Sequence, residues 1–139
     1  MADIFSSAKR SEVMRQIKAK DTVPELRVRR SLHSKGYRFI LHDKRLPGTP
    51  DIVLPKYRAV IQVRGCFWHG HICKDGHIPK TRREYWQNKL LSNSERDRRN
   101  DKKLRKMGWK VIVVWECRTQ SKAKLGKSLK YITQRLGIL

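Results

Sequence analysis

Three cysteines and two histidines constrain this chain more than any other feature of its sequence. Cys66, His69, His71 and Cys73 lie within eight residues of an irregular segment that follows an apolar run, and Cys117 comes later. Thiolate and imidazole are preferred zinc ligands, so Cys66, His71, Cys73 and Cys117 predict a closed tetrahedral zinc site with a structural role. The alternative is that the cysteines are small buried residues and His71 is incidental.

The charge of the chain indicates a polyanionic partner. Lysine and arginine number 34 against 12 acidic residues, a formal net charge of +22 in 139 residues. This excess favours nucleic acid. No apolar run approaches the ~20 residues that span a bilayer, and the N-terminus has no signal-peptide pattern, so we expect a cytoplasmic protein without a membrane partner. The odd number of cysteines argues against a disulfide framework.

Capping residues and hydrophobic periodicity predict one α/β domain with a mixed central sheet flanked by helices. At the start of the second helix, Thr22 fits as N-cap and Glu25 takes the capping-box position. Residues 1–20, an arm and a short basic helix, would contact DNA ahead of a zinc-containing domain over residues 21–139. The predicted helices cover 12–20, 23–35, 79–107 and 121–136, and the predicted strands cover 37–42, 51–54, 59–63 and 111–115.

The register of two short strands predicts where Asp51 lies. If Leu54 pairs with Ala59 across the connection between them, Asp51 lies opposite Gln62. Side chains of such a pair are about 5 Å apart. Asp51 would therefore lie beside the end of the strand that leads into the cysteine and histidine segment.

This placement suggests phosphodiester hydrolysis. Asp51 is the natural anchor for Mg²⁺, and the main-chain carbonyl of Val63 could be a second ligand. Neutral His69 could take a proton from water, a contribution of about 10²–10⁴-fold. Asp97 could orient that imidazole, and Glu25 could face the same site. The alternatives are structural: a turn cap for Asp51, a helix cap for Glu25 and a hydrogen-bonded structural role for His69.

The long basic helix over residues 79–107 favours contact with phosphates. Asp97 falls on the same line as Trp86 and Leu90, so its carboxylate should point inward, where it needs a donor or a cation. Ten cations on the remaining faces make a phosphate-facing role more natural than a merely solvated surface. These ten are Arg82, Arg83, Lys89, Arg96, Arg98, Arg99, Lys102, Lys103, Arg105 and Lys106.

Aromatic residues near the histidine segment are candidates for contact with bases. Phe67 and Trp68 are consecutive in an irregular segment, where both cannot easily point inward, and Trp86 opens the basic helix. We infer that these rings insert between base steps, which is easiest at a mismatched pair. Met14 could enter the minor groove from the helix over 12–20. The alternatives are core packing for the rings and weak surface docking for that helix.

With these residues assembled, the chain resembles the bacterial very-short-patch repair (Vsr) DNA mismatch endonucleases over essentially its whole length. The resemblance rests on several motifs taken together. They are Arg10-Ser11 with Met14, Asp21-Thr22 with Glu25, Leu46-Pro47-Gly48-Thr49-Pro50-Asp51, Gly65-Cys66-Phe67-Trp68-His69-Gly70-His71 with Cys73, Glu95-Arg96-Asp97-Arg98-Arg99, Gly108-Trp109 and Val114-Trp115-Glu116-Cys117.

The resemblance implies a restriction-endonuclease-like fold and Mg²⁺-dependent nicking on the 5′ side of the thymine in a T·G mismatch, the product of 5-methylcytosine deamination. It implies that Asp51 and the Val63 carbonyl hold Mg²⁺, that His69 activates water and that Glu25 and Asp97 assist through metal-bound waters. The four zinc ligands, the three inserting aromatics and the methionine keep the roles given above. The protein would be a nucleoid-associated monomer, with mismatch-repair factors as candidate partners.

Two positions depart from the family pattern. A histidine is common where this chain has Arg64, and threonine is familiar where it has Val63. The second change is tolerable because the expected ligand is main chain. Arginine cannot lose its proton at working pH, so Arg64 could hold the scissile phosphate or the charge of the leaving oxygen but could not act as a base. Weakened cleavage is one consequence.

Two further functions compete with nicking. The charge alone would support a non-catalytic, zinc-stabilised DNA-binding protein. An enzyme with catalytic zinc is disfavoured, because four protein ligands leave the metal no open position.

Overall fold

The computed structural model describes residues 21–69, 71, 73 and 78–137, so Met14 and the helix predicted over 12–20 lie outside the described residues. Within this part of the chain, three strands lie between the first and second α-helices, and a fourth strand lies between the second and third. The elements are α2 (Val23–Ser34), β1 (Ile40–Leu41), β2 (Ile52–Leu54), β3 (Ala59–Arg64), α3 (Arg83–Lys106), β4 (Lys110–Trp115) and α4 (Lys122–Leu136), with the short 3-10 helices η1 (Pro55–Tyr57) and η2 (Glu116–Arg118).

The strands form a mixed sheet in the order β1-β2-β3-β4. β2 pairs antiparallel with both β1 and β3, and Leu54 pairs with Ala59, which confirms the predicted register. β3 and β4 run parallel over six pairs, from Ala59↔Lys110 to Arg64↔Trp115. Because the two strands are parallel and in step, their carboxyl ends lie side by side.

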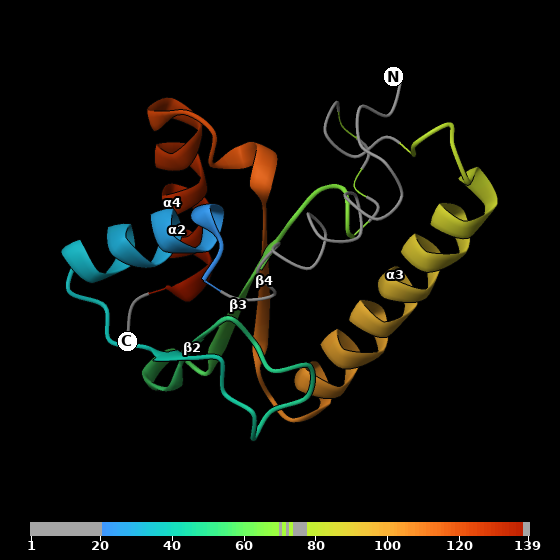
Figure 1. Cartoon of the computed structure of the whole chain (residues 1–139). Coiled ribbons are helices and arrows are strands. Elements are labelled where there is room, and N and C mark those ends of the chain that lie inside the picture. The colour runs from blue at the N-terminus through green and yellow to red at the C-terminus, as the bar shows by residue number, and fades with distance from the viewer. Residues whose placement is uncertain (1–20, 70, 72, 74–77, 138–139) are drawn as a thin grey trace.

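Helices cover both faces of this sheet (Figure 1). On one face α2 and α4 pack against Ile61 and Ile112, and on the other α3 packs Leu104 against Val60 and Val111. Successive residues of β3 and β4 therefore enter different cores, as expected for strands that are apolar without interruption. The prediction that the strand over 111–115 is covered on both faces is confirmed, and so is the mixed α/β architecture.

Local signals explain most helix ends. The Thr22 side chain accepts a hydrogen bond from the Glu25 N–H at 3.4 Å, which caps α2. The prediction that α3 begins at residue 79 was wrong, because Arg82 takes a left-handed conformation with φ of 55° and the helix begins after it. α3 is long but strongly basic, and no helix within the described residues is apolar enough over a sufficient length to cross a bilayer.

The first strand is shorter than the predicted range of 37–42. Only Ile40 and Leu41 pair with β2. Tyr37 and Phe39 pack against the core on the α2 and α4 side instead. The strand then ends because His42 adopts a left-handed backbone conformation with φ of 49°. This turn directs the chain towards Asp51, whose carbonyl accepts a hydrogen bond from the His42 N–H at 3.1 Å.

We expect Leu104→Ala to destabilise the protein by about 2–5 kcal/mol, because Leu104 is 0% exposed and joins α3 to the sheet. Leu91→Ala is the matched control on the same helix. Leu91 is 56% exposed, so its truncation should change the free energy of unfolding by less than about 0.5 kcal/mol. Urea unfolding monitored by circular dichroism measures both values, and equal losses would contradict this account of the α3 packing.

Candidate active site and metal centre

The adjacent carboxyl ends of β3 and β4 carry both candidate centres. β3 ends at Arg64 and leads to Cys66, and β4 ends at Trp115 and leads to Cys117. The two cysteines lie close enough for the Cys117 N–H to donate to the Cys66 Sγ at 3.4 Å. A loop after one strand is thereby brought to the end of the next.

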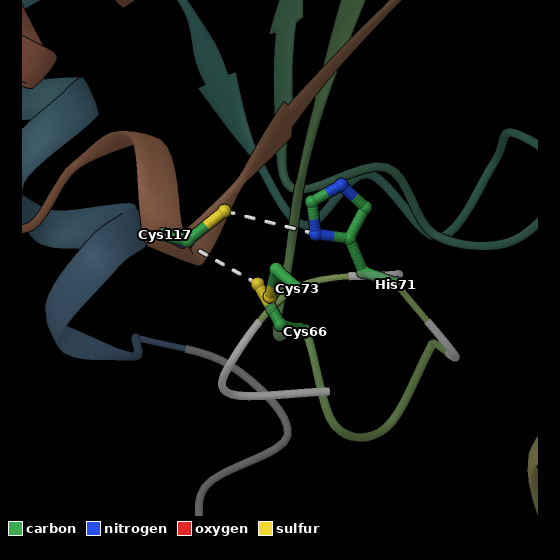
Figure 2. A group of neighbouring side chains, drawn as sticks. All are labelled: Cys66, His71, Cys73 and Cys117. Atoms are coloured by element: carbon green, nitrogen blue, oxygen red, sulfur yellow. Dashed lines mark hydrogen bonds between the residues drawn. The ribbon is translucent and has the colours of Figure 1, made fainter. Parts of the chain in front are cut away.

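The four predicted zinc ligands come together. The Sγ atoms of Cys66, Cys73 and Cys117 and a ring nitrogen of His71 all lie within 4.8 Å of one another. Figure 2 shows these side chains converging, with 3.7 Å between the Cys117 Sγ and the His71 Nδ1. A tetrahedral zinc with bonds of about 2.3 Å to sulfur and about 2.0 Å to nitrogen separates its ligand atoms by roughly 3.5–3.8 Å. The donor set and its spacing therefore fit zinc.

The surroundings of this cluster orient its ligands. The Trp115 ring stacks on His71 with centroids 4.1 Å apart and planes 12° apart. The Cys66 N–H donates to the Glu116 Oε1 at 3.2 Å. Burial, together with the neighbouring thiols, raises the pKa of Cys66 to about 12. The thiol therefore stays protonated at neutral pH until a cation stabilises the thiolate.

Asp51 lies at the end of β3, as its register predicts. Its Oδ2 accepts a hydrogen bond from the Val63 N–H at 2.8 Å. Since the N–H and C=O of a strand residue point to the same edge, the Val63 carbonyl also faces the Asp51 side. Burial, with a smaller contribution from the nearby Glu25 carboxylate, raises the pKa of Asp51 to about 6 despite the hydrogen bond from the Val63 N–H, which lowers it. The Asp51 carboxylate and the Val63 carbonyl face the same edge of β3, and both are oxygen ligands of the kind that Mg²⁺ prefers. A cation there would compensate the negative charge of the buried carboxylate.

Glu25 lies beside Asp51 in a network that the sequence analysis missed in part. Its Oε2 is 3.1 Å from an Arg29 guanidinium nitrogen and 3.1 Å from the His42 Nε2. Asp21 contacts the same two partners at 2.8 and 3.3 Å. Asp21, Glu25 and His42 could together hold a cation, but Arg29 already supplies a positive charge to both carboxylates. Arg29 follows Glu25 by one helical turn, and this spacing of opposite charges is the sequence signal that could have predicted their ion pair.

The second part of the site joins β3 and the segment after it to α3. The His69 Nδ1 lies 2.5 Å from the Asp97 Oδ2. The Ser94 Oγ donates to the His69 carbonyl at 3.3 Å, and the His69 N–H donates to the Gly65 carbonyl at 3.2 Å. The prediction that Asp97 points inward to a partner is confirmed. Asp97 holds the imidazole of His69, and Ser94 and the Gly65 carbonyl hold its backbone.

Arg64 also reaches α3. Its guanidinium Nη2 donates to both carboxylate oxygens of Asp101 at 2.8 Å, and its Nε lies 3.9 Å from the Asp97 Oδ2. A cavity of about 190 Å³ opens here. Its lining consists of Arg64, His69, Ser94, Asp97, Arg98, Asp101 and Trp115. In this structure the Arg64 guanidinium is thus paired with the Asp101 carboxylate of α3.

The three predicted aromatic residues form one cluster at the start of α3. The centroid of Phe67 lies 5.0 Å from that of Trp68 and 5.3 Å from that of Trp86. Trp86 is 8% exposed, whereas Phe67 and Trp68 are half-buried. The Asn93 amide donates to the Trp68 carbonyl at 3.0 Å. In this structure the rings pack on one another, and their entry into DNA stays a prediction.

Two arginines predicted to contact DNA are exposed on or beside α3. The Arg82 guanidinium lies 4.4 Å from the centroid of the Tyr85 ring. The Arg96 guanidinium donates to the Asn93 Oδ1 at 2.8 Å. Both hold their charge near the aromatic cluster.

Comparison with known proteins identifies the family to which this chain is similar. The family model described as DNA mismatch endonuclease Vsr matches residues 2–75. The chain is 43% identical to the DNA mismatch endonuclease Vsr of Escherichia coli K12 over 136 residues, which cover 98% of this chain and 86% of that protein. It is 47% identical to the type II nicking enzyme V.NmeAIP of Neisseria meningitidis, over 98% and 97% of the two chains.

A third relative, the type II nicking enzyme V.XorIIP of Xanthomonas oryzae, is 48% identical over 95% of this chain and 97% of that protein. Together with the carboxylates, the histidine and the basic helix, these relatives make the chain a DNA endonuclease. It belongs to the Vsr family of DNA mismatch endonucleases, as its sequence motifs indicate.

We expect the purified protein to hold one zinc ion and His71→Ala to lose it, because removal of one of four converging ligands opens the site. The melting temperature should fall by several degrees, and zinc uptake by the metal-free protein should release protons from its thiols. His33→Ala is the control, since His33 is exposed on α2. Elemental analysis and calorimetry measure these quantities, and a His71→Ala protein that retains full zinc would contradict the ligand set.

The raised pKa of Asp51 predicts a pH-dependent stability of the metal-free protein. A carboxyl whose folded pKa is about 6 rather than 3.8 stabilises the fold below about pH 4, and this contribution is lost as pH rises through 6. Asp51→Asn keeps an acceptor for the Val63 N–H but cannot ionise. It should be more stable than wild type by roughly 2–3 kcal/mol at pH 7.5 and equal to it near pH 4.

Urea unfolding at several pH values without Mg²⁺ measures this difference. Glu84→Gln, at an exposed position of α3, is the control and should follow the wild-type curve. Parallel pH curves for Asp51→Asn and wild type would show that Asp51 is not a source of this instability.

Proposed function

We propose that this protein nicks one strand of duplex DNA on the 5′ side of the thymine in a T·G mismatch, with Mg²⁺ at Asp51 and a restriction-endonuclease-like fold. The observation that carries the proposal is the assembly at the end of β3. The Asp51 carboxylate accepts a hydrogen bond from the Val63 N–H there. His69, in the segment that follows the same strand, pairs with Asp97 of α3. Membership of the family, whose Escherichia coli relative is named a DNA mismatch endonuclease, supports it.

Asp51 and the Val63 carbonyl would hold Mg²⁺, with Glu25 beside them. When bound, the ion supplies charge stabilisation to the phosphate and orients the reacting groups. Glu25 is held by Arg29 and His42, so its carboxylate stays next to Asp51, where it would accept hydrogen bonds from water beside the ion. The residues themselves therefore provide a charged cradle with little freedom to rearrange.

His69 would act as the base. Asp97 accepts a hydrogen bond from Nδ1, which leaves Nε2 as the nitrogen that can take a proton. Water that attacks the phosphorus would give up its proton to Nε2 as the bond between phosphorus and the leaving oxygen breaks, and the leaving oxygen would take up a proton from solvent to become a hydroxyl. The Ser94 contact to the His69 carbonyl holds the loop in position through this step.

DNA would lie along α3 and the aromatic cluster. Arg82 and Arg96 would contact phosphates, Phe67, Trp68 and Trp86 would enter or support the opened base step, and Met14 of the arm over residues 1–20 would approach from the other groove. A mismatched pair is already poorly stacked, so insertion there costs less than at a normal pair. The zinc cluster would fix the segment that carries these rings.

The Arg64–Asp101 contact bears on how strongly the protein cuts. In this structure Arg64 neutralises carboxylates of α3, which favours a charge-balancing role over direct contact with the scissile phosphate. A nuclease slower than relatives with histidine at this position is consistent with that role. We propose that the protein acts as a monomer, with mismatch-repair factors as candidate partners.

We expect a labelled duplex with a single T·G mismatch to be nicked by the wild-type protein in the presence of Mg²⁺ and to stay intact when Mg²⁺ is omitted. Asp51→Asn and His69→Gln should each lower the nicking rate at least about 10²-fold, because each loses a function of the reaction centre. His33→Gln repeats the second substitution at an exposed position and should cut normally. Denaturing electrophoresis of each labelled strand identifies the cut.

A matched duplex with a G·C pair tests specificity in the same assay. Binding of mismatched DNA without nicking, at any Mg²⁺ concentration, would favour a non-catalytic zinc-stabilised DNA-binding protein instead. Equal cutting of both duplexes would leave an endonuclease but remove the assignment to T·G mismatches.

A further inference from the structure

Arg64 and Asp101 form a nearly buried ion pair beside the proposed base. The two side chains are 12% and 9% exposed, and the guanidinium Nη2 lies 2.8 Å from both carboxylate oxygens. A carboxylate in such a place needs a donor or a cation. The proposed reaction gives a role to Asp97 but none to Asp101.

Two carboxylates compete for Arg64. Asp97 and Asp101 lie one turn apart on α3 and therefore face the same region. The Arg64 Nε is 3.9 Å from the Asp97 Oδ2, which is the same oxygen that contacts the His69 Nδ1. Arginine remains charged at all working pH values. A guanidinium released at this place would move to Asp97 and displace the imidazole from its acceptor.

We propose that Asp101 is a positioning residue that holds Arg64 away from Asp97, so that Asp97 remains the partner of His69. Asp101 acts through Arg64 and touches no reacting group. The inference rests on the proposed function, because it assigns value to the His69–Asp97 pair only if His69 serves in nicking.

The cavity around these residues supports this division of roles. Arg64, Asp97 and Asp101 line the same space of about 190 Å³ as His69, so the guanidinium and the histidine border one cavity. The attraction of Asp101 for Arg64 favours the observed pairing over a closer Arg64–Asp97 pair. Removal of one carboxylate should therefore change the pairing and not only the local charge.

A double-mutant cycle tests the inference. Asp101→Asn should slow the single-turnover nicking of a T·G duplex about tenfold and leave DNA affinity within about twofold, because Arg64 then engages Asp97. Arg64→Gln with Asp101→Asn should nick faster than Asp101→Asn alone, since no guanidinium remains to compete. Glu84→Gln makes the same charge change at an exposed position of α3 and should match wild type.

A merely structural role for Asp101 predicts a different pattern. The loss would then persist or grow in the double variant and would follow the melting temperature. Either result would overturn the inference while leaving the proposed function intact, provided that the wild-type protein nicks the mismatch.

Proton NMR of the protein without Mg²⁺ or DNA gives a readout that does not depend on activity. The His69 Nδ1–H, assigned by its absence in His69→Gln, should be protected from exchange in wild type because it donates to Asp97. It should broaden or disappear in Asp101→Asn and return in the double variant. An unchanged resonance in Asp101→Asn would also overturn the inference.

Discussion

The parallel pairing of β3 with β4 is the constraint on which the remaining structure depends. Six residue pairs keep the two strands in step, so the segments after Arg64 and Trp115 leave the sheet at the same place. This is why Cys66 and Cys117 can share a metal with His71 and Cys73, although 51 residues separate the first two in sequence. Antiparallel pairing with β2 on the other edge of β3 brings Asp51 to the Val63 N–H. One strand therefore locates both the cysteine cluster and the carboxylate.

Both centres contain groups whose charged forms are unfavourable in the metal-free protein. Burial raises the pKa of Cys66 and of Asp51, and the neighbouring thiols and Glu25 add to these shifts. The surface of the protein carries the opposite imbalance, with a net charge of +22. The cysteine cluster and the Asp51 carboxylate therefore favour cations, although the chain as a whole repels them. The basic surface favours polyanionic DNA. This division is compatible with a basic chain that belongs to a family of DNA endonucleases and offers two internal clusters able to hold cations.

Several features followed from the sequence because they depend on neighbours along the chain. The register from Leu54 to Ala59 was predictable because a short connection leaves few ways to pair two strands. The inward direction of Asp97 followed from helical periodicity with Trp86. The start of α3 was misplaced because the left-handed conformation of Arg82 has no reliable signal in residue type. The first strand was overestimated because packing of aromatic residues against the core replaced strand pairing.

The sequence by itself determined the chemical inventory: the thiols and imidazole of a candidate metal cluster, the basic helix, and Asp51, His69 and Asp97 as candidate groups for action on a phosphodiester. Only the tertiary structure decided which partner each charged group receives. The Arg64 contact to Asp101 spans 37 residues and the His42 contact to Glu25 joins a strand end to a helix, so neither follows from local periodicity. The stacking of Trp115 on His71 likewise requires two segments to meet. Pairing at such distances is fixed by how the sheet and helices pack, because packing alone sets the separation of residues remote in sequence.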